Sequence, residues 1–242
     1  MVIFVGGPGR TGTTLMMAML NAHSEVTMYP EVHPFGSKPL DVNNKQFVAR
    51  MQRAGVEMPE NLPAETFCER CEVVKHILRH ARTPHSGIKI MNDIRNHRQL
   101  SKVFDAKYIC MYRDPRDMYA SQKKCGGMAG SSVEAAMNSY KKTIEACIGE
   151  LDILMVKYEF LVAQTSSAME TVLAFLGLEW EDSVLCHTAY PNALTKDHSV
   201  SHYSREQIMR PVNGDSIGKW QTELSVEEAA IIESMTDDIY LF

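Results

Sequence analysis

Four short runs of apolar residues stand out along the chain, at positions 2–5, 87–90, 108–112 and 153–156. Each run has the length of a strand, and helical patterns separate it from the next. The apolar residues follow one another instead of alternating with polar ones, which is typical of strands buried on both faces. This order predicts an α/β fold with three layers, in which helices flank a central, mostly parallel sheet. Because no repeat, linker or low-complexity tract divides the chain, we expect a single domain over 1–242.

Capping signals and prolines predict where several other elements begin and end. Asp114 precedes Pro115, so a capping carboxylate stands before a proline that suits the first position of a helix. The stretches Ser167–Glu170 and Ser225–Glu228 have the spacing of a capping box, which predicts a helix start at each serine. The stretch Tyr29–Lys45 has three prolines and no periodicity, and we expect a loop beside the carboxyl edge of the sheet.

The first apolar run leads directly into GGPGRTGTTL, residues 6–15. Gly7 and Gly12 keep the spacing of a phosphate-binding loop between a strand and a helix. In such a loop, backbone N–H groups and the positive end of the helix face one anion, and threonine hydroxyls donate as well. The pattern predicts a P-loop-like fold with an anion site after the first strand. The alternative is a glycine-rich turn that binds nothing.

The loop lacks the lysine that reaches the γ-phosphate in nucleotide triphosphatases. Thr13 holds that position, whereas Arg10 lies within the loop itself. A guanidinium without the lysine suits a ligand that has no magnesium-bridged triphosphate. The rival hypothesis, a kinase that uses ATP and magnesium, is weakened by Thr13 and by the lack of an evident acidic strand end for the metal.

A second strand ends on polar residues about a hundred positions later, in YICMYRDPRD at 108–117. Arg113 stands at the carboxyl end of this strand, and Ser121 lies two turns into the helix that follows. Both side chains can face the crevice in which open α/β sheets bind ligands, where Arg113 can hold a second phosphate. The alternative is an ion-pair cluster on the surface, formed by Arg113 and its acidic neighbours.

One group of residues has the types that bind zinc: Cys68, Cys71, His76 and His80. On a continuous helix Cys71 falls on the apolar stripe, while the two histidines fall on the opposite side. The four side chains then cannot converge on one tetrahedral ion, so we expect a plain helix and no metal.

Composition and charge narrow the function further. Apolar residues make up 45% and charged residues 23%, as in ordinary globular domains. The net charge of −5 argues against a nucleic-acid partner, whose binding surface is basic. No apolar run approaches the ~18 residues of a membrane span, and no signal peptide precedes the first strand. Six cysteines without framework spacing indicate free thiols, with Cys110 and Cys147 buried, so we expect a cytoplasmic protein without a membrane partner, provided Met1 is the natural start.

Taken together, PGRTGTTL at 8–15, YRDPRD at 112–117 and a serine eight residues after Arg113 resemble the sulfotransferase family. Members of that family take the sulfuryl group from 3′-phosphoadenosine 5′-phosphosulfate. Their first loop holds the 5′-phosphosulfate and their second element holds the 3′-phosphate. The resemblance therefore implies this donor, adenosine 3′,5′-bisphosphate as its product, and no metal. The missing lysine then has a reason, because the donor has no β- or γ-phosphate.

The later part of the chain is similar to the protein-tyrosine sulfotransferase branch. The segment Lys157–Leu178 resembles its tyrosine-bearing segment and the following helix, and 204–220 resembles a stretch that a serine opens and a Lys-Trp pair closes. Two features depart from the branch. No cysteine pair matches its disulfides, and Cys125 stands where a further basic residue follows the serine of the second element. The donor contacts implied by the resemblance are Arg10, Thr11, Gly12, Thr13, Thr14, Leu15, Arg113, Ser121, Tyr158, Ser204, Arg210, Asn213 and Lys219.

The resemblance also implies an in-line transfer in which an acceptor hydroxyl attacks sulfur. Glu31 lies where the branch places its glutamate base, and His33 is the other candidate base. Arg10, Lys89 and Ser204 are expected to meet the negative charge that develops during transfer. An inactive nucleotide-binding protein is the alternative, and the presence of Glu31 and Lys89 argues against it. The acceptor stays open between a peptide tyrosine, a sugar and a small molecule, and so does the oligomeric state, a homodimer included.

Overall fold

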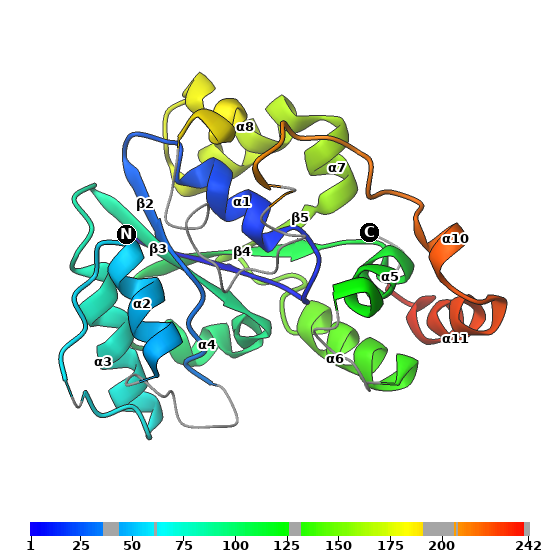
Figure 1. The fold of residues 1–242 in the computed structure, drawn as a ribbon, viewed down its shortest axis with the longest axis horizontal. Coiled ribbons are helices and arrows are strands. Elements are labelled where there is room, and N and C mark those ends of the chain that lie inside the picture. The colour runs from blue at the N-terminus through cyan, green and yellow to red at the C-terminus, as the bar shows by residue number, and fades with distance from the viewer. Residues whose placement is uncertain (36–43, 61, 126–131, 191–205, 207, 240–242) are drawn as a thin grey trace.

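The computed structural model describes residues 1–35, 44–60, 62–125, 132–190, 206 and 208–239. At its centre lies a five-stranded parallel sheet with the strand order β2-β3-β1-β4-β5 (Figure 1). The strands are β1 (Val2–Gly6), β2 (Val26–Tyr29), β3 (His85–Met91), β4 (Ala106–Tyr112) and β5 (Ile153–Lys157). The four predicted strands are confirmed. The edge strand β2 was not predicted, because its four residues are too few to show a period.

Helices cover both faces of this sheet (Figure 1). They are α1 (Thr13–Leu20), α2 (Lys45–Arg53), α3 (Phe67–Leu78), α4 (His97–Leu100), α5 (Pro115–Cys125), α6 (Val133–Glu145), α7 (Tyr158–Ala163), α8 (Thr165–Leu176), α10 (Trp220–Glu223) and α11 (Val226–Thr236). Two 3₁₀ helices, η1 (Asn92–Asn96) and η2 (Asp182–Ala189), follow β3 and α8.

The side chains of β1 alternate between two hydrophobic cores. Phe4 packs into the core formed with α2, α3 and α6, whereas Ile3 and Val5 pack into the core formed with α1 and α8. All three side chains are fully buried, as expected for a central strand between two helical layers. The three-layer α/β fold predicted from the sequence is confirmed.

Two of the three predicted helix starts are correct. The carboxylate of Asp114 accepts a hydrogen bond of 2.9 Å from the N–H of Arg116 at the start of α5, and Ser225 forms a full capping box at the start of α11. The start at Ser167 is wrong. The backbone breaks earlier, at Gln164 (φ −134°), so α8 begins at Thr165 and contains Ser167. Of the predicted loop, Tyr29 belongs to β2 and Lys45 to α2, residues 30–35 are neither helix nor strand, and 36–43 lie outside the described residues.

Helix α3 carries the residues that resembled a zinc site. Cys71 is buried in the core, whereas Cys68 is exposed. His76 bonds instead to the carbonyl of Glu57 (2.7 Å), and His80 to the carbonyl of His76 (2.9 Å). Among the residues that the structure describes, no group of three or more His, Cys, Asp or Glu side chains is arranged to hold a metal ion.

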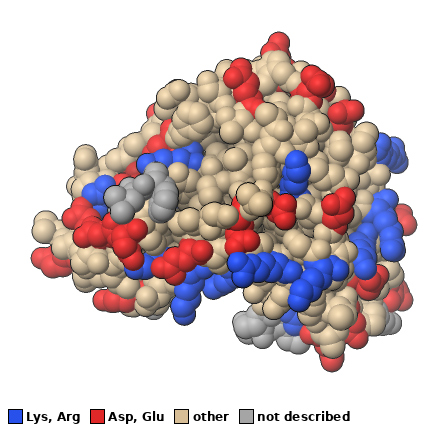
Figure 2. Space-filling model, turned by 180° about the vertical axis from the view of Figure 1, so that it is seen from behind, with Lys and Arg blue, Asp and Glu red and all other residues tan. Residues whose placement is uncertain are grey.

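Charge on the surface is mixed. Figure 2 shows Lys and Arg side chains beside Asp and Glu side chains over one face of the molecule. All six cysteines are free thiols, and Cys110 and Cys147 are buried as predicted. Within the described part of the chain, no helix has both the length and the apolar character needed to cross a membrane.

Candidate active site

The loop between β1 and α1 has the backbone shape that its glycines predict. Gly7 (φ 131°) and Gly12 (φ 92°) both have positive φ, where a side chain is strained. A Cβ atom on Gly7 would lie 2.1 Å from the carbonyl oxygen of Met111, and one on Gly12 would lie 2.7 Å from the ring of Tyr158. The loop therefore packs directly against β4 and α7, with no room for side chains at these two positions.

The three threonines of the loop have different roles. The hydroxyl of Thr11 is fully buried and donates to the carbonyl of Pro8 (2.7 Å), so it shapes the loop from within. Thr13 is buried and contacts the sulfur of Met91 (3.6 Å). Thr14 is more open, and its hydroxyl lies 3.5 Å from the amine of Lys89. A lysine of the neighbouring strand β3 thus stands beside the loop that lacks one.

The second predicted element meets this loop at the carboxyl ends of β1 and β4. The Nε of Arg10 donates a hydrogen bond to the hydroxyl of Ser121 on α5 (3.1 Å), although 111 positions separate them. The Nη1 of Arg113 donates to the carbonyl of Arg10 (3.2 Å). Three of the predicted site residues therefore form one hydrogen-bonded group.

Arg113 is buried, with 5% of its surface exposed. Its guanidinium lies over the ring of Tyr158, 4.7 Å from the centroid, and donates to the carbonyl of Ser216. Asp117, 3.9 Å away, is buried as well. The alternative of a surface ion-pair cluster is therefore wrong for this pair, which holds the loop, α7 and the segment 216–220 together.

Helix α5 also fixes the segment 216–220, which the sequence did not reveal. The carboxylate of Asp117 accepts hydrogen bonds from the backbone N–H groups of Gly218 (2.7 Å) and Trp220 (3.0 Å). The guanidinium of Arg116 lies over the indole ring of Trp220, 4.1 Å from the centroid. These contacts fix the backbone on both sides of Lys219. The sequence signal that points to a role for Asp117 is its position one helical turn after Arg113.

The remaining predicted donor contacts are less well defined. Leu15 lies in the first turn of α1 and packs against the core. The side chains of Arg210 and Asn213 are exposed, and Asn213 bonds within its own turn, to the carbonyl of Pro211 (3.0 Å). Ser204 lies outside the described residues.

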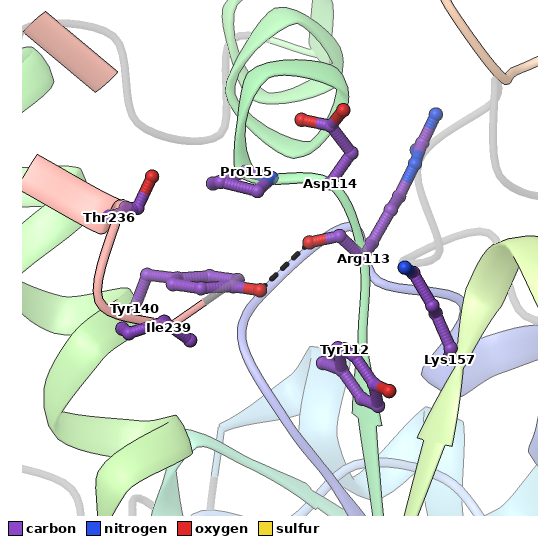
Figure 3. A pocket seen from close by; sticks show the side chains of 8 residues that line it. All are labelled: Tyr112, Arg113, Asp114, Pro115, Tyr140, Lys157, Thr236 and Ile239. Atoms are coloured by element: carbon purple, nitrogen blue, oxygen red, sulfur yellow. Dashed lines mark hydrogen bonds between the residues drawn. The ribbon is translucent and has the colours of Figure 1, made fainter. Parts of the chain in front are cut away.

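A pocket lies on the other side of Arg113, between β4, β5, α6 and the end of α11 (Figure 3). It is lined by Tyr112, Arg113, Asp114, Pro115, Tyr140, Lys157, Thr236 and Ile239. The hydroxyl of Tyr140 donates to the carbonyl of Arg113 (2.8 Å), and the Arg113 side chain extends away from it. Tyr140 therefore fixes the strand end from which Arg113 projects.

Glu31, Lys89 and His33 form the second half of the site. One carboxylate oxygen of Glu31 lies 2.6 Å from the amine of Lys89, and the other lies 2.5 Å from Nε2 of His33. Burial by itself would raise the pKa of Glu31, but the charge of Lys89 and the hydrogen bond from His33 outweigh it and hold the pKa well below its usual range. The hydrogen bond to Glu31 raises the pKa of His33. Glu31 is therefore ionised at neutral pH, between the amine of Lys89 and the ring of His33.

Comparison with known proteins bears directly on this geometry. The model of the family described as "Sulfotransferase family" matches residues 3–182, which include the loop, α5, Arg113 and the group of Glu31, His33 and Lys89, and which end before the segment 216–220. This chain belongs to the sulfotransferase family. The resemblance inferred from its motifs is confirmed, as is the expectation of a sulfotransferase enzyme with a P-loop-like fold, and neither the kinase nor the inactive alternative is favoured.

Among the relatives, protein-tyrosine sulfotransferase 1 of Danio rerio is 29% identical over 255 residues, which cover 97% of this chain and 70% of that protein. Protein-tyrosine sulfotransferase A of Caenorhabditis elegans is 29% identical over 253 residues, 96% of this chain and 64% of that one. The chain thus spans about two thirds of the length of these relatives. Of the solved structures, mouse sulfotransferase SULT7A1, complexed with PAP, has the same fold, with a TM-score of 0.57 and 11% identity, and the match covers 100% of this chain and 85% of that one.

Proposed function

We propose that this sulfotransferase transfers the sulfuryl group of 3′-phosphoadenosine 5′-phosphosulfate to a phenolic hydroxyl of the tyrosine type. The observation that carries the proposal is the hydrogen-bonded group of Arg10, Ser121 and Arg113. It places the guanidinium of Arg10, in the loop after β1, against α5, the helix that follows β4. A donor with two separate phosphate groups needs such paired sites, whereas a magnesium-bridged triphosphate needs one extended site.

The loop between Gly7 and Thr14 suits the phosphosulfate end of the donor. Its glycines let the loop backbone pass close to β4 and α7, and the N-terminus of α1 adds a positive dipole. Ser121 and Lys219 are the candidates for the 3′-phosphate. Arg113 gives two of its five N–H donors to the carbonyls of Arg10 and Ser216, so we assign it first to holding the loop.

The chemistry follows from the charges of Glu31, Lys89 and Arg10. The acceptor oxygen forms a new bond to sulfur as the bond from sulfur to the bridging phosphate oxygen breaks, and adenosine 3′,5′-bisphosphate leaves with that electron pair. The proton of the acceptor hydroxyl goes to the carboxylate of Glu31. Lys89 and Arg10 stabilise the negative charge on the sulfuryl group and the leaving oxygen. The role of Ser204 in stabilising this negative charge stays a prediction.

The tyrosine-type acceptor rests on the names of the relatives, which are protein-tyrosine sulfotransferases. A phenol also suits an ionised carboxylate as base, since its pKa of ~10 lies far below that of an alkyl alcohol. A sugar or a small alcohol is the competing acceptor. A homodimer, a cytoplasmic location, and the absence of nucleic-acid and membrane partners stay predictions.

The decisive experiment is an acceptor screen with sulfur-labelled donor in the presence of a chelator. Peptides that contain tyrosine, the same peptides with phenylalanine, a sugar panel and simple alcohols are compared. We expect label on the tyrosine peptides alone. The variant Lys89→Met should lose most of the activity, whereas Lys75→Met is its matched control, because Lys75 is a partly exposed lysine on α3 that also pairs with a glutamate. If the label appears only on sugars or alcohols, the proposed tyrosine-type acceptor is wrong. If the label appears on no hydroxyl, the proposed transfer reaction is wrong.

A further inference from the structure

His33 lies between two carboxylates. Its Nε2 is 2.5 Å from Glu31, and its Nδ1 faces the carboxylate of Asp93 at 3.9 Å. Asp93 is buried, with 7% exposed, whereas the ring of His33 is half exposed. Both ring nitrogens therefore face carboxylates, Nε2 at hydrogen-bond distance and Nδ1 at ion-pair distance, and this arrangement favours the doubly protonated, charged imidazole.

The surroundings hold this arrangement in place. The carboxylate of Asp93 accepts a hydrogen bond from the N–H of Phe35 (2.9 Å), so the loop after β2 is tied to η1. The N–H of Val32 donates to the carbonyl of Lys89 (3.1 Å), which ties the same loop to β3. The stretch between these two bonds contains His33, and its freedom to move relative to Lys89 is small.

We propose that His33 is a positioning residue for the transfer reaction: in its charged form it holds the carboxylate of Glu31 against Lys89, and Asp93 holds His33. The inference rests on the proposed function, in which Glu31 is the base. It decides between the two candidate bases, because a histidine that already carries both protons cannot accept one from the acceptor. In this proposal Asp93 orients His33, a role that no sequence motif indicated.

The charges around His33 agree with this role. Glu31 and Asp93 are its negative neighbours, Lys89 on β3 and Arg95 on η1 are the positive groups nearby, and Arg70 of α3 donates to the carbonyl of Pro34 (3.4 Å) next to it. The hydrogen bond to Glu31 raises the pKa of His33, which burial and Lys89 oppose and Asp93 supports. Burial raises the pKa of Asp93, and its bond from Phe35 opposes this.

The sign of the pH dependence separates the two roles. A base must be neutral, so with His33 as the base kcat would rise as pH rises through the pKa of His33. A positioning cation must be charged, so kcat should fall across the same range, above the unperturbed value of about 6.5. The test therefore starts with kcat for a tyrosine peptide between pH 5.5 and 9, as roughly the range in which histidine titrates.

Three variants complete the test. His33→Gln keeps a donor to Glu31 but has no titrating group; we expect kcat within about threefold of the wild type at pH 6 and no falling limb. His33→Ala should lose about 10- to 100-fold, as for one hydrogen bond to a charged group. Asp93→Asn should move the falling limb to lower pH, because it removes the negative charge behind the ring. The KM for the donor should stay unchanged in all three.

A second measurement needs no turnover. The ring signals of His33, assigned by their loss in His33→Gln, are titrated by NMR in wild type, Asp93→Asn and Glu31→Gln. Both of the latter variants should lower the pKa of His33. An unchanged pKa in both, a wild-type kcat that rises or stays flat with pH, or a His33→Gln variant as inactive as His33→Ala would each overturn the inference. If no hydroxyl accepts sulfate at all, the titration still decides the His33–Asp93 pair, and only the proposed function fails.

Discussion

The buried carboxylate of Asp117 accepts a hydrogen bond of 2.7 Å from the backbone N–H of Gly218, which lies 101 positions later. The helix that carries Asp117 also carries Ser121, the partner of Arg10. Arg113, just before this helix, bonds to both the first loop and Ser216. The loop, α5 and the segment 216–220 are thus one hydrogen-bonded unit. We therefore expect a substitution in any of the three to change the affinity of the donor site.

We expect Asp117→Ala to destabilise the fold and to weaken binding of adenosine 3′,5′-bisphosphate. The variant leaves the N–H groups of the half-buried Gly218 and Trp220 without this acceptor, and a hydrogen bond to a charged group contributes about 1.5–3 kcal/mol. Urea unfolding should show a loss of roughly that size, and calorimetry should show weaker binding. Asp238→Ala, which removes an exposed carboxylate paired with Lys141, is the control and should change neither. Full affinity in Asp117→Ala would mean that the segment 216–220 does not contribute to the donor site.

A pair of glycines tests whether the first loop tolerates side chains. Gly7 and Gly55 both have positive φ, but a Cβ on Gly7 would lie 2.1 Å from the carbonyl of Met111, whereas one on Gly55 meets nothing within 4 Å. We expect Gly55→Ala to cost about 1–2 kcal/mol, the penalty of left-handed backbone. Gly7→Ala should cost clearly more and should abolish binding of the bisphosphate. Equal losses of unfolding free energy in the two variants would contradict the packing of the loop on β4.

The sequence predicted those parts of the molecule whose causes are local. The glycine spacing of the first loop follows from backbone conformation, and the apolar runs of β1, β3, β4 and β5 follow from burial between the helical layers. The capping box at Ser225 was predicted correctly, and the one at Ser167 was not. A break at Gln164, directly after the end of α7, starts α8 before Ser167 is reached. Such a break depends on packing, which spacing does not reveal.

Contacts between segments that are distant in the chain could not be predicted from the sequence. Arg113 was expected to bind a phosphate, yet in the structure it is bonded to the carbonyls of Arg10 and Ser216. Every residue has a backbone carbonyl, so the residue types do not indicate which carbonyl accepts a hydrogen bond from Arg113. These partners can be identified only from the arrangement of the strands. The same holds for Lys89, which approaches Thr14 only because β3 lies next to β1.

Arg113→Ala tests this revised role. If Arg113 mainly holds the loop, its loss should weaken adenosine 3′,5′-bisphosphate and adenosine 5′-phosphosulfate by similar amounts, about 1.5–3 kcal/mol each. Ser121→Ala, which leaves Arg113 in place, should weaken mainly the bisphosphate, because adenosine 5′-phosphosulfate has no 3′-phosphate. Calorimetry with both ligands measures the four affinities. A loss in Arg113→Ala that is confined to the bisphosphate would return Arg113 to direct contact with the 3′-phosphate.

Removal of metal ions should leave the protein unchanged. On α3, Cys68 is exposed and Cys71 is buried, and His76 and His80 bond to backbone carbonyls. We therefore expect a chelator to alter neither the thermal unfolding temperature nor kcat. Mass spectrometry under native conditions checks the metal content of the same sample. One zinc ion bound per chain would contradict the description of α3 as a plain structural helix.

The pH dependence of stability tests the charges around Glu31. The pKa of Glu31 is lowered in the folded protein, so its contribution is present above the unfolded value of about 4.3 and is lost as pH falls through the folded pKa. The pKa of His33 is raised by Glu31, so that contribution is present below about 6.5 and is lost as pH rises through the folded pKa. Both contributions disappear in Glu31→Gln.

The difference in unfolding free energy between wild type and Glu31→Gln should therefore be largest between about pH 4.3 and 6.5 and should shrink on both sides. Urea unfolding at intervals of pH measures it. Glu72→Gln, which removes an exposed carboxylate paired with Lys75, is the control, and its difference should show no decline above neutral pH, because the ion-pair partner of Glu72 is a lysine and not a histidine. The same Glu31→Gln variant should lose at least ~10²-fold in kcat, the low end for removal of a general base, with little change in donor affinity. A difference that keeps growing above pH 7 would show that His33 is not held in its charged form by Glu31.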